Sequence, residues 1–426
     1  MGATLSEPVT IKDTNSIQND NYIVGSSCMQ GWRIEMEDGH THLLDNDNGA
    51  FFGVYDGHGG ASVSQFASLH LHKRIMDNDK FKEGKIEEAI VEGYLAMDRQ
   101  MLDDDVMKND TSGSTSVVCI IHKGTLYTGW SGDSRAVCSY DSQSLPLSFD
   151  HKPMNKVEFE RIQKAGGYVE FNRVNGNLAL SRALGDFVYK RNKTVGASEQ
   201  IVTAHPELTT HVMDDKFEFL IIACDGIWDV MTNQEAVDFV RSRLADGIAP
   251  EKVCEQMLDH CLSPDSRMEG LGCDNMTVII VCLLQGGTYE QFVKKVSTAG
   301  NPKAVSKFVI PDVEVMSESA PQEQRPGRQE SEEGNEGDEL EGLRELDGLK
   351  EYLQKLVQAQ GGDSQTLERL VRSGILRASE EDEDEPPIAF EIVDNGEEDG
   401  AVEVEDVTED DTKVKNGNIS ESNGKL

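Results

Sequence analysis

Two apolar runs that lie far apart in the sequence each stop abruptly at an Asp-Gly pair. Residues 51–55 lead into Asp56, and residues 218–224 lead into Asp225, with glycine following each aspartate. A short apolar run bounded by glycine is typical of a buried strand, and glycine lets the backbone approach a ligand closely. A strand that ends in an ordinary turn gives the same local pattern, so the repetition is what suggests a function.

Three more aspartates occupy related places. Asp133 follows the apolar run at 125–130, Asp274 precedes the last apolar run, and Asp229 lies one helical turn after Asp225. If these strands share one sheet system, their carboxylates converge at one rim. Two like charges about 4 Å apart repel by roughly 4 kcal/mol at an effective dielectric near 20, and protonation relieves only part of that cost. Bound divalent cations would remove it, and an all-oxygen ligand set without a Cys or His cluster favours Mg²⁺ or Mn²⁺ over Zn²⁺.

Two further side chains suit phosphate chemistry at such a rim. A two-metal site can activate a bridging water and neutralise a phosphoryl group. The planar guanidinium of Arg33 could clamp the phosphate oxygens, and His58 could donate a proton to the leaving alkoxide. Each residue also has an ordinary explanation, because Arg33 alone could form a surface ion pair and His58 alone could be a loop histidine. Glu37 and Asp38 alone could be solvated acids.

Overall charge and cysteine usage limit the classes of partner and compartment. The formal net charge is −38, from 78 acidic and 40 basic residues. Nucleic acid and anionic membranes require clustered Lys and Arg, so neither is an expected partner. The eight cysteines show no CxxC pairing, and several lie in apolar runs. We therefore expect reduced thiols in an intracellular protein.

The N-terminus and the hydropathy pattern bear on location. No apolar stretch is long enough to span a bilayer, and the N-terminus lacks the pattern of a secretion signal. Its first six residues match the myristoylation motif, with Gly2 as the acceptor. A single acyl chain without a polybasic signal gives only weak, reversible membrane contact. The sequence thus favours a cytoplasmic protein, also compatible with the nucleus.

Composition divides the chain into segments. Residues 301–426 carry 34 acidic and 13 basic side chains, a composition typical of disorder. Leucines spaced by three and four predict a helix within this part. The predicted segments are an N-terminal arm at 1–20, a catalytic domain at 21–290 with an irregular flap at about 151–200, and an acidic extension at 291–426 with helices near 339–360 and 366–376 and disorder elsewhere.

Eight stretches, in order, resemble those of the metal-dependent serine/threonine protein phosphatases of type 2C. They cover roughly residues 20–285, and no matched functional position departs from the family pattern. The stretches are MQGWRIEMEDGH (29–40), FFGVYDGHGG (51–60), SGSTSVV (112–118), SGDSRAV (131–137), DHKP (150–153), NGNLALSRALGD (175–186), ACDGIWDVM (223–231) and GCDNMTVII (272–280).

The resemblance implies a role for each candidate residue. Arg33 would bind the substrate phosphate, His58 would be the general acid, and Arg182 in the flap would be a further phosphopeptide contact. The implied metal ligands are Asp56 bridging two ions, the Gly57 carbonyl on one of them, Asp225 and Asp274 on the other, Glu37 and Asp38 through bound waters, and Asp133 and Asp229 with Asp225 around a third, weaker ion.

The resemblance also implies a fold and an activity. The fold is α+β, with a central antiparallel β-sandwich flanked by α-helices on both faces in four layers (αββα), followed by the acidic extension. The activity is hydrolysis of phosphoserine and phosphothreonine in signalling proteins, by attack of a metal-bridging water on phosphorus. Such enzymes typically work without separate regulatory subunits, so a monomer is expected. Specificity would lie in the flap and in the extension, which would bind regulatory partners.

The residues alone also leave three different functions open. Residues 260–267 fit HCx5R, the outline of a cysteine-dependent phosphatase loop around Cys261. However, Pro264 removes a backbone donor, and Asp265 would repel an anion. The chain could also be an inactive phosphoprotein-binding scaffold that acts through the acidic tail, or a small-molecule phosphohydrolase with the same site. The sequence does not choose Mg²⁺ over Mn²⁺ or identify the physiological substrates.

Overall fold

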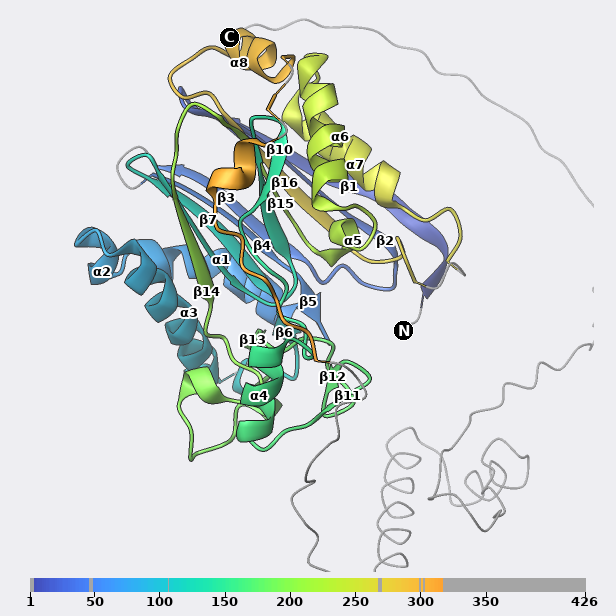
Figure 1. Cartoon of the computed structure of the whole chain (residues 1–426). Helices are drawn as coiled ribbons and strands as arrows, with labels where there is room; N and C mark the ends of the chain where they lie inside the picture. The colour runs from blue at the N-terminus through green and yellow to red at the C-terminus, as the bar shows by residue number, and fades with distance from the viewer. Residues whose placement is uncertain are drawn as a thin grey trace, which may run out of the picture. The chain divides into compact units, whose positions relative to one another are not determined.

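The computed structural model describes residues 4–45, 49–105, 107–266, 270–298, 300–301 and 303–316. Three predictions concern residues outside these ranges, namely acylation of Gly2, the helices near 339–360 and 366–376, and disorder elsewhere in the extension beyond residue 316. They therefore stay predictions. Within the described ranges, groups of antiparallel strands are separated by groups of helices, in keeping with the predicted α+β class (Figure 1).

The first sheet has six strands, and every neighbouring pair is antiparallel. Its spatial order is β1 (Thr4–Gln18), β2 (Tyr22–Arg33), β16 (Met276–Leu283), β15 (Phe217–Ala223), β9 (Arg135–Tyr140) and β10 (Gln143–Pro146).

The second sheet has five strands and is also fully antiparallel. Its spatial order is β14 (Glu207–Val212), β8 (Thr125–Ser131), β7 (Ser116–His122), β4 (Gly49–Tyr55) and β3 (Gly39–Asp45).

Strand β15 shows why the central runs are apolar at every position. All of its residues are buried, and successive side chains of a strand point to opposite faces. Phe219 and Ile221 join a hydrophobic cluster with helices on one face. Leu220 and Ile222 join a second cluster, which also contains Val54 and other residues of the five-stranded sheet. The sheet is therefore buried on both faces, and its strands lack the alternation of a half-exposed strand.

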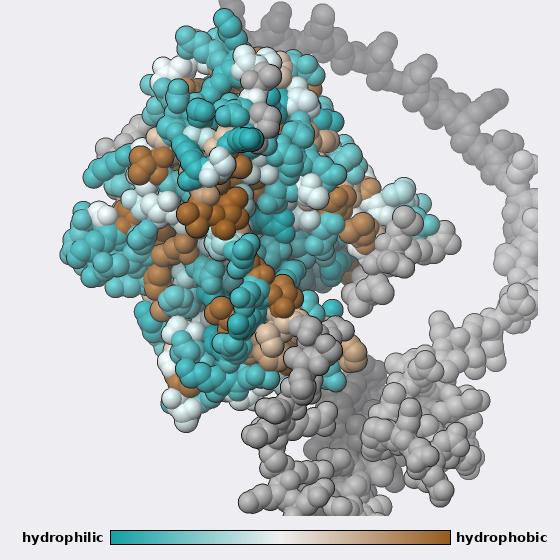
Figure 2. All heavy atoms as spheres, in the orientation of Figure 1, coloured by the Kyte–Doolittle hydropathy of each residue, from teal (hydrophilic) through white to brown (hydrophobic). Residues whose placement is uncertain are grey.

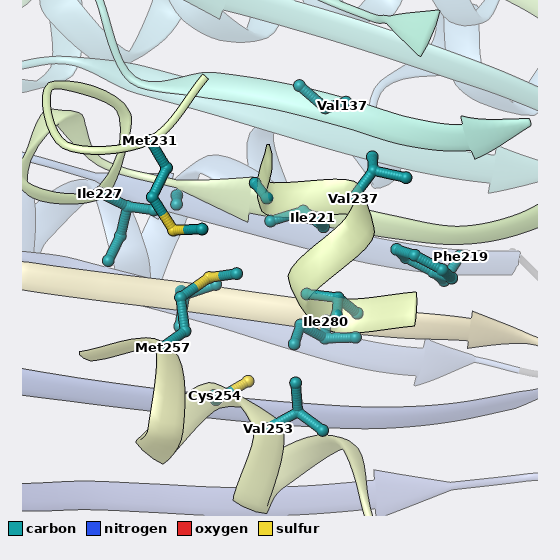
Figure 3. Close-up of a cluster of buried hydrophobic side chains, with 14 of the residues drawn as sticks. Val137, Phe219, Ile221, Ile227, Met231, Val237, Val253, Cys254, Met257 and Ile280 are labelled. Atoms are coloured by element: carbon teal, nitrogen blue, oxygen red, sulfur yellow. The ribbon is translucent and has the colours of Figure 1, made fainter. Parts of the chain in front are cut away.

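Helices cover these sheets with amphipathic faces. Helices α5 (Asp225–Trp228), α6 (Asn233–Ala245) and α7 (Pro250–Cys261) contribute to the cluster around Phe219 and Ile221, shown in Figure 3. Thr232 caps α6 with a capping box to Glu235, and Pro250 begins α7 at a position where a missing N–H costs little. Helices α1 (Ser62–Met76), α2 (Asp79–Lys82) and α3 (Ile86–Asp103) pack in another cluster with residues of β4 and β7.

Smaller elements complete the described chain. The flap has its own small core, in which Val169, Val174 and Ile162 are buried together. The smaller elements are β5 (Gly57–His58), β6 (Gly113–Ser114) and β13 (Leu184–Gly185) in one three-stranded sheet, the hairpin of β11 (Val169–Glu170) and β12 (Arg173–Val174), helix α4 (Lys156–Lys164), and the 3-10 turns Met107–Asn109, Phe187–Tyr189, Ala197–Glu199 and Ala304–Lys307.

The N-terminal segment differs from its prediction. We predicted a polar arm at 1–20, but Thr4–Gln18 forms β1, the edge strand paired with β2. None of its described side chains is fully buried, so the apolar signal of a core strand is missing from the sequence. Backbone hydrogen bonds to β2, and an ion pair of 2.6 Å between Lys12 and Asp259 of α7, hold it in place.

The packed structure also continues past the predicted boundary at residue 290. Helix α8 (Tyr289–Val296) buries Phe292 and Val296 against the cluster of α6 and α7. Phe308 then packs edge-on against Tyr140, with ring centroids 5.0 Å apart. The part of the extension that adjoins the domain is therefore ordered through contacts that composition alone does not reveal.

The surface and the cysteines complete the description. The face in Figure 2 is mostly hydrophilic, with separate hydrophobic patches. None of the helices in the described ranges combines the length and hydropathy needed to cross a bilayer. No disulfide joins the eight cysteines, and all of them except Cys28 are buried.

Candidate metal centre and phosphate pocket

Strand ends from both sheets meet around one pocket of about 460 Å³. Asp56 follows β4, Asp133 follows β8, Asp225 follows β15 and Asp274 precedes β16. These ends meet at one rim, as the repeated motif predicts. The candidate residues that line the pocket are Arg33, Glu37, Asp56, Gly57, His58, Asp133, Asp225 and Asp274. A larger pocket of about 610 Å³ has only Asp214 and Asp215 as carboxylates, so size alone does not identify the site.

The carboxylates in this pocket are poorly compensated by the protein. Burial, followed by the charges of neighbouring aspartates, raises the pKa of Asp56 well above its ordinary value. The same causes raise the pKa of Asp225. Burial also raises the pKa of Asp38 to about 7. Two carboxylate oxygens, Asp38 Oδ1 and Asp225 Oδ1, are buried without a hydrogen-bond partner among the residues that the structure describes. Such atoms are costly unless a cation approaches them.

Asp38 is held next to Asp56. Thr277 Oγ1 donates a hydrogen bond of 2.7 Å to Asp38 Oδ2. One ligand atom each from Asp38, Asp56 and Cys224 lie within 4.8 Å of one another. Burial raises the pKa of the Cys224 thiol, with the nearby carboxylates adding to the shift. The oxygens are therefore the charged groups that face a cation here.

The loop that carries Glu37 and Asp38 is positioned by one amide side chain. Asn275 Oδ1 accepts a hydrogen bond of 2.9 Å from the Glu37 N–H, and Asn275 Nδ2 donates to the Glu35 carbonyl at 3.0 Å. Gly57 lies so close to this loop that a Cβ there would be 2.3 Å from the Glu37 carbonyl oxygen. Only glycine therefore allows the loop to pack against the strand end.

Arg33 is anchored at the end of β2. Its Nη2 donates to Asp274 Oδ2 at 2.5 Å, and both side chains remain partly exposed to the pocket. One guanidinium edge is thus fixed by Asp274. The remaining N–H groups are available to a phosphate, because a guanidinium carries five donors.

His58 has a buried carboxylate partner. Its Nε2 lies 2.6 Å from Asp186 Oδ2. Burial lowers the pKa of His58, but the hydrogen bond and the charge of Asp186 outweigh it, so the net shift is upward. Asp186 has φ = 49°, an unusual value for a non-glycine residue. A Cβ at Gly113 would lie 2.3 Å from His58 Nε2 and 2.2 Å from Asp186 Oδ2, so the pair depends on that glycine.

The third predicted ion site contains a cation of the protein. Lys152 Nζ forms an ion pair with Asp133 Oδ2. Burial lowers the pKa of Lys152, but the charge of Asp133 outweighs it and raises the pKa above its ordinary value. Burial also raises the pKa of Asp229, and Lys152 partly offsets the rise. The positive charge of the Lys152 ammonium group thus partly compensates both Asp133 and Asp229.

Arg182, predicted as a phosphopeptide contact, is held by ion pairs at the base of the flap. Its side chain is buried and does not line the pocket. Its Nη2 contacts Glu158 Oε1 at 2.6 Å and Glu207 Oε1 at 2.8 Å, and its Nη1 donates to the His205 carbonyl. The guanidinium therefore stabilises the base of the flap. The flap residue with a guanidinium that lines the pocket is Arg173.

The geometry around Cys261 disfavours a cysteine-dependent phosphatase. Cys261 ends helix α7 and is buried. Burial raises the pKa of its thiol to about 12, whereas a nucleophilic cysteine needs a lowered pKa. Arg267 of the HCx5R pattern lies outside the described residues.

Sequence reasoning missed four residues that hold the site residues in place. They are Lys152, Asp186, Asn275 and Thr277. All four lie inside the quoted motifs, but each acts on a residue distant in the sequence. Position within a motif could have identified them as candidates, but no local pattern reveals their partners.

The chain is similar to proteins of one known family. The family model described as "Protein phosphatase 2C" matches residues 22–270. The Caenorhabditis elegans protein named "Probable protein phosphatase 2C T23F11.1" is 56% identical over 298 residues, covering 69% of this chain and 84% of that protein. "Protein phosphatase 2C homolog 2" of Aspergillus flavus is 47% identical over 306 residues, covering 68% and 70%.

A solved structure has a similar fold. The crystal structure of "serine-threonine phosphatase 2C from Toxoplasma gondii" aligns with a TM-score of 0.54 and 21% identity. The alignment covers 64% of this chain and all of that chain. At this identity the likeness concerns the fold alone.

Proposed function

Because the chain belongs to the protein phosphatase 2C family, we propose that it is a metal-dependent protein serine/threonine phosphatase. The observation that carries the proposal is the set of under-compensated carboxylates around one pocket that also contains Arg33 and His58. An inactive scaffold would have no need for this costly arrangement, because buried uncompensated charges destabilise a fold.

The residues of the pocket fit a hard divalent cation. Their donors are oxygens, and Asp38 Oδ1 and Asp225 Oδ1 have no hydrogen-bond partner. Asp56, Asp225 and Asp274 would hold the core ions together with the Gly57 carbonyl, while Glu37 and Asp38 would act through water. Asp133 and Asp229, with Asp225, would hold a third, weaker ion, which would compete with the Lys152 ammonium group for Asp133. Bound Mg²⁺ or Mn²⁺ would supply charge neutralisation and an activated water.

Arg33 would bind and orient the phosphate. Asp274 holds one edge of its guanidinium at 2.5 Å, which limits the rotamers available to a long side chain. A planar fork fixed in this way can accept two phosphate oxygens at once and align the phosphorus for in-line displacement. The side chain thus contributes orientation as well as charge.

His58 would act as the proton donor to the leaving group. The carboxylate of Asp186, 2.6 Å from Nε2, stabilises the protonated ring. A serine or threonine alkoxide is a poor leaving group, so a proton delivered to its oxygen lowers the barrier. The other ring nitrogen would face the substrate.

The experiment that tests the function is turnover of a phosphothreonine peptide by the full chain. We expect hydrolysis with Mn²⁺ or Mg²⁺, none after chelation, and recovery when metal is returned. Asp56→Asn should be inactive, and Cys261→Ser should keep activity. Failure to hydrolyse the peptide with metal would contradict the proposal. Faster hydrolysis of sugar phosphates than of phosphopeptides would favour a small-molecule phosphohydrolase.

Finer features belong to the same proposal. We propose the four-layer αββα arrangement, supported by the separate hydrophobic clusters along the sheets. We also propose a monomer in the cytoplasm or nucleus, with reversible membrane contact through an acyl chain on Gly2. Partners that bind the acidic extension would add regulation. The mass of the N-terminal peptide from cells tests the acylation directly.

A further inference from the structure

One guanidinium at the pocket has no carboxylate partner. Arg173 lines the same pocket as Arg33 and the aspartates. Its side chain is exposed, and its Nη1 donates to the Asn177 carbonyl at 2.6 Å. Among the described residues it forms no ion pair. The guanidinium therefore keeps donors that none of the described residues uses.

The other cationic side chains near the pocket already form ion pairs with carboxylates of the protein. Arg33 pairs with Asp274, and Lys152 pairs with Asp133. Arg182, the flap residue that the family resemblance suggested as a substrate contact, is paired with Glu158 and Glu207. Arg173 is therefore the guanidinium among the described pocket residues that is left to bind a second anionic group.

The backbone under Arg173 is fixed by packing. In the β11–β12 hairpin, Val169 pairs with Val174 and Glu170 pairs with Arg173. The two turn residues have φ values of 48° and 54°, which is typical of a tight two-residue hairpin turn. Val174 is fully buried in the flap core. Because adjacent residues of a strand point to opposite faces, Arg173 is held away from that core.

We propose that Arg173 is a specificity-determining residue that binds a second anionic group on the substrate chain, close to the phosphorylated residue. This inference rests on the proposed function. Arg33 lies at the end of β2 and Arg173 in the flap, so the two cations come from different parts of the pocket wall. A planar guanidinium fork matches either a carboxylate or a second phosphate.

The test compares hydrolysis, by the full chain with Mn²⁺, of a parent phosphopeptide and of its charged variants, which we call its sisters. The parent is a phosphothreonine peptide with neutral neighbours. Its sisters carry one aspartate or one phosphoserine at each position within three residues of the phosphothreonine. The quantity measured is the ratio of kcat/KM between a charged sister and the parent. This ratio is taken for the wild type, for Arg173→Gln, and for Arg191→Gln, which removes an exposed flap arginine that does not line the pocket.

We expect a charged sister to be preferred about fivefold by the wild type, mainly through KM, as for one exposed charge pair. Arg173→Gln should reduce the ratio to about one, and Arg191→Gln should keep it. Added salt should weaken the preference. A preference for both sisters means that any anionic side chain is accepted, and a preference for phosphoserine alone identifies a second phosphate.

Two results would overturn the inference while leaving the proposed function intact. The first is a wild type that hydrolyses parent and sisters equally. The second is a preference that survives Arg173→Gln or disappears equally in Arg191→Gln. If the wild type hydrolyses no phosphopeptide at all with metal, the proposed function itself fails. The two failures are therefore distinguishable in one experiment.

Discussion

The flap and the pocket rim both bury carboxylates, but they neutralise them differently. In the flap, Glu158 lies 2.6 Å from the guanidinium groups of Arg161 and Arg182. Burial raises the pKa of Glu158, yet the two arginines outweigh it and hold the pKa well below its ordinary value. At the rim, burial and neighbouring aspartates raise the pKa of Asp56 and Asp225. The flap thus neutralises Glu158 with its own cations, whereas Asp56 and Asp225 at the rim leave that role to a ligand.

The difference separates a structural cluster from a functional one. A paired buried carboxylate needs its partners, so removal of either side leaves an uncompensated charge. A cluster of like charges destabilises the metal-free protein, so removal of one carboxylate should increase its stability. Replacement of a carboxylate by its amide should therefore affect stability with opposite sign in the two regions.

The largest expected effect is that of Asp56→Asn on activity. Loss of a ligand that bridges the core ions should lower kcat/KM on the order of a thousandfold, because charge stabilisation at such a site is worth several kcal/mol. In chelator, the thermal midpoint should stay unchanged or rise, since one of several repelling carboxylates is gone. Steady-state kinetics and thermal unfolding check both parts. The control is Asp103→Asn, an exposed aspartate at the end of α3.

Glu158→Gln should act on stability instead. The change leaves Arg161 and Arg182 buried beside a neutral amide, so the free energy of unfolding should fall by about 3–5 kcal/mol. Urea unfolding in the presence of a chelator measures this change in the free energy of unfolding. Glu160→Gln on the exposed side of the same helix is the matched control and should change little. If Glu158→Gln were as stable as the wild type and Asp56→Asn were destabilised, the proposed difference between the flap and the rim would be wrong.

The pH dependence of stability should also differ between the regions. Burial raises the pKa of Asp38 to about 7, above roughly 3.9 in an unfolded chain. The folded protein then holds a proton that the unfolded chain has lost, so stability of the metal-free protein should fall as pH rises from about 4 to 7. Glu158 has a lowered pKa, so its contribution is present above its unfolded pKa, roughly 4.3, and is lost only in acid.

Urea unfolding in chelator at about pH 5 and pH 7.5 tests this dependence on either side of the Asp38 pKa. Asp38→Asn should reduce this dependence, with Asp56 and Asp225 supplying the remainder, and saturating Mn²⁺ should reverse it, because metal binding displaces the proton. A wild type that is equally stable at both values would show that the rim carboxylates are compensated within the protein.

The local part of this organisation was predictable from sequence. Continuous apolar runs indicated the central strands, for instance the runs at 51–55 and 218–224, which correspond to β4 and β15. Strand ends marked by Asp-Gly pairs indicated Asp56 and Asp225 as members of one site. Both predictions depend on short-range signals that packing reinforces, since buried strands need apolar residues and close approach needs glycine.

The pairings between distant residues were not predictable. Arg182 sits in a motif of the family, but its partners Glu158 and Glu207 lie 24 and 25 residues away and no local signal links them. Strand β1 lies at a sheet edge and has polar side chains. It pairs with β2 through backbone hydrogen bonds, and such bonds produce no recognisable pattern of residue types in the sequence. Asp186 likewise meets His58 across 128 residues.

The smallest expected effect concerns a residue of this long-range kind. Thr277→Val keeps the shape of the side chain but removes the donor to Asp38 Oδ2, a hydrogen bond of 2.7 Å. Groups that orient a metal ligand typically contribute about tenfold in affinity, so Mn²⁺ binding measured by calorimetry should weaken by about that factor. Thr128→Val, in the buried part of β8, is the control and should leave affinity unchanged. If Thr277→Val bound Mn²⁺ as tightly as the wild type, the hydrogen bond from Thr277 to Asp38 would not contribute to metal affinity at the rim. The contrast with the flap, where Arg161 and Arg182 are fitted to Glu158, would then be complete.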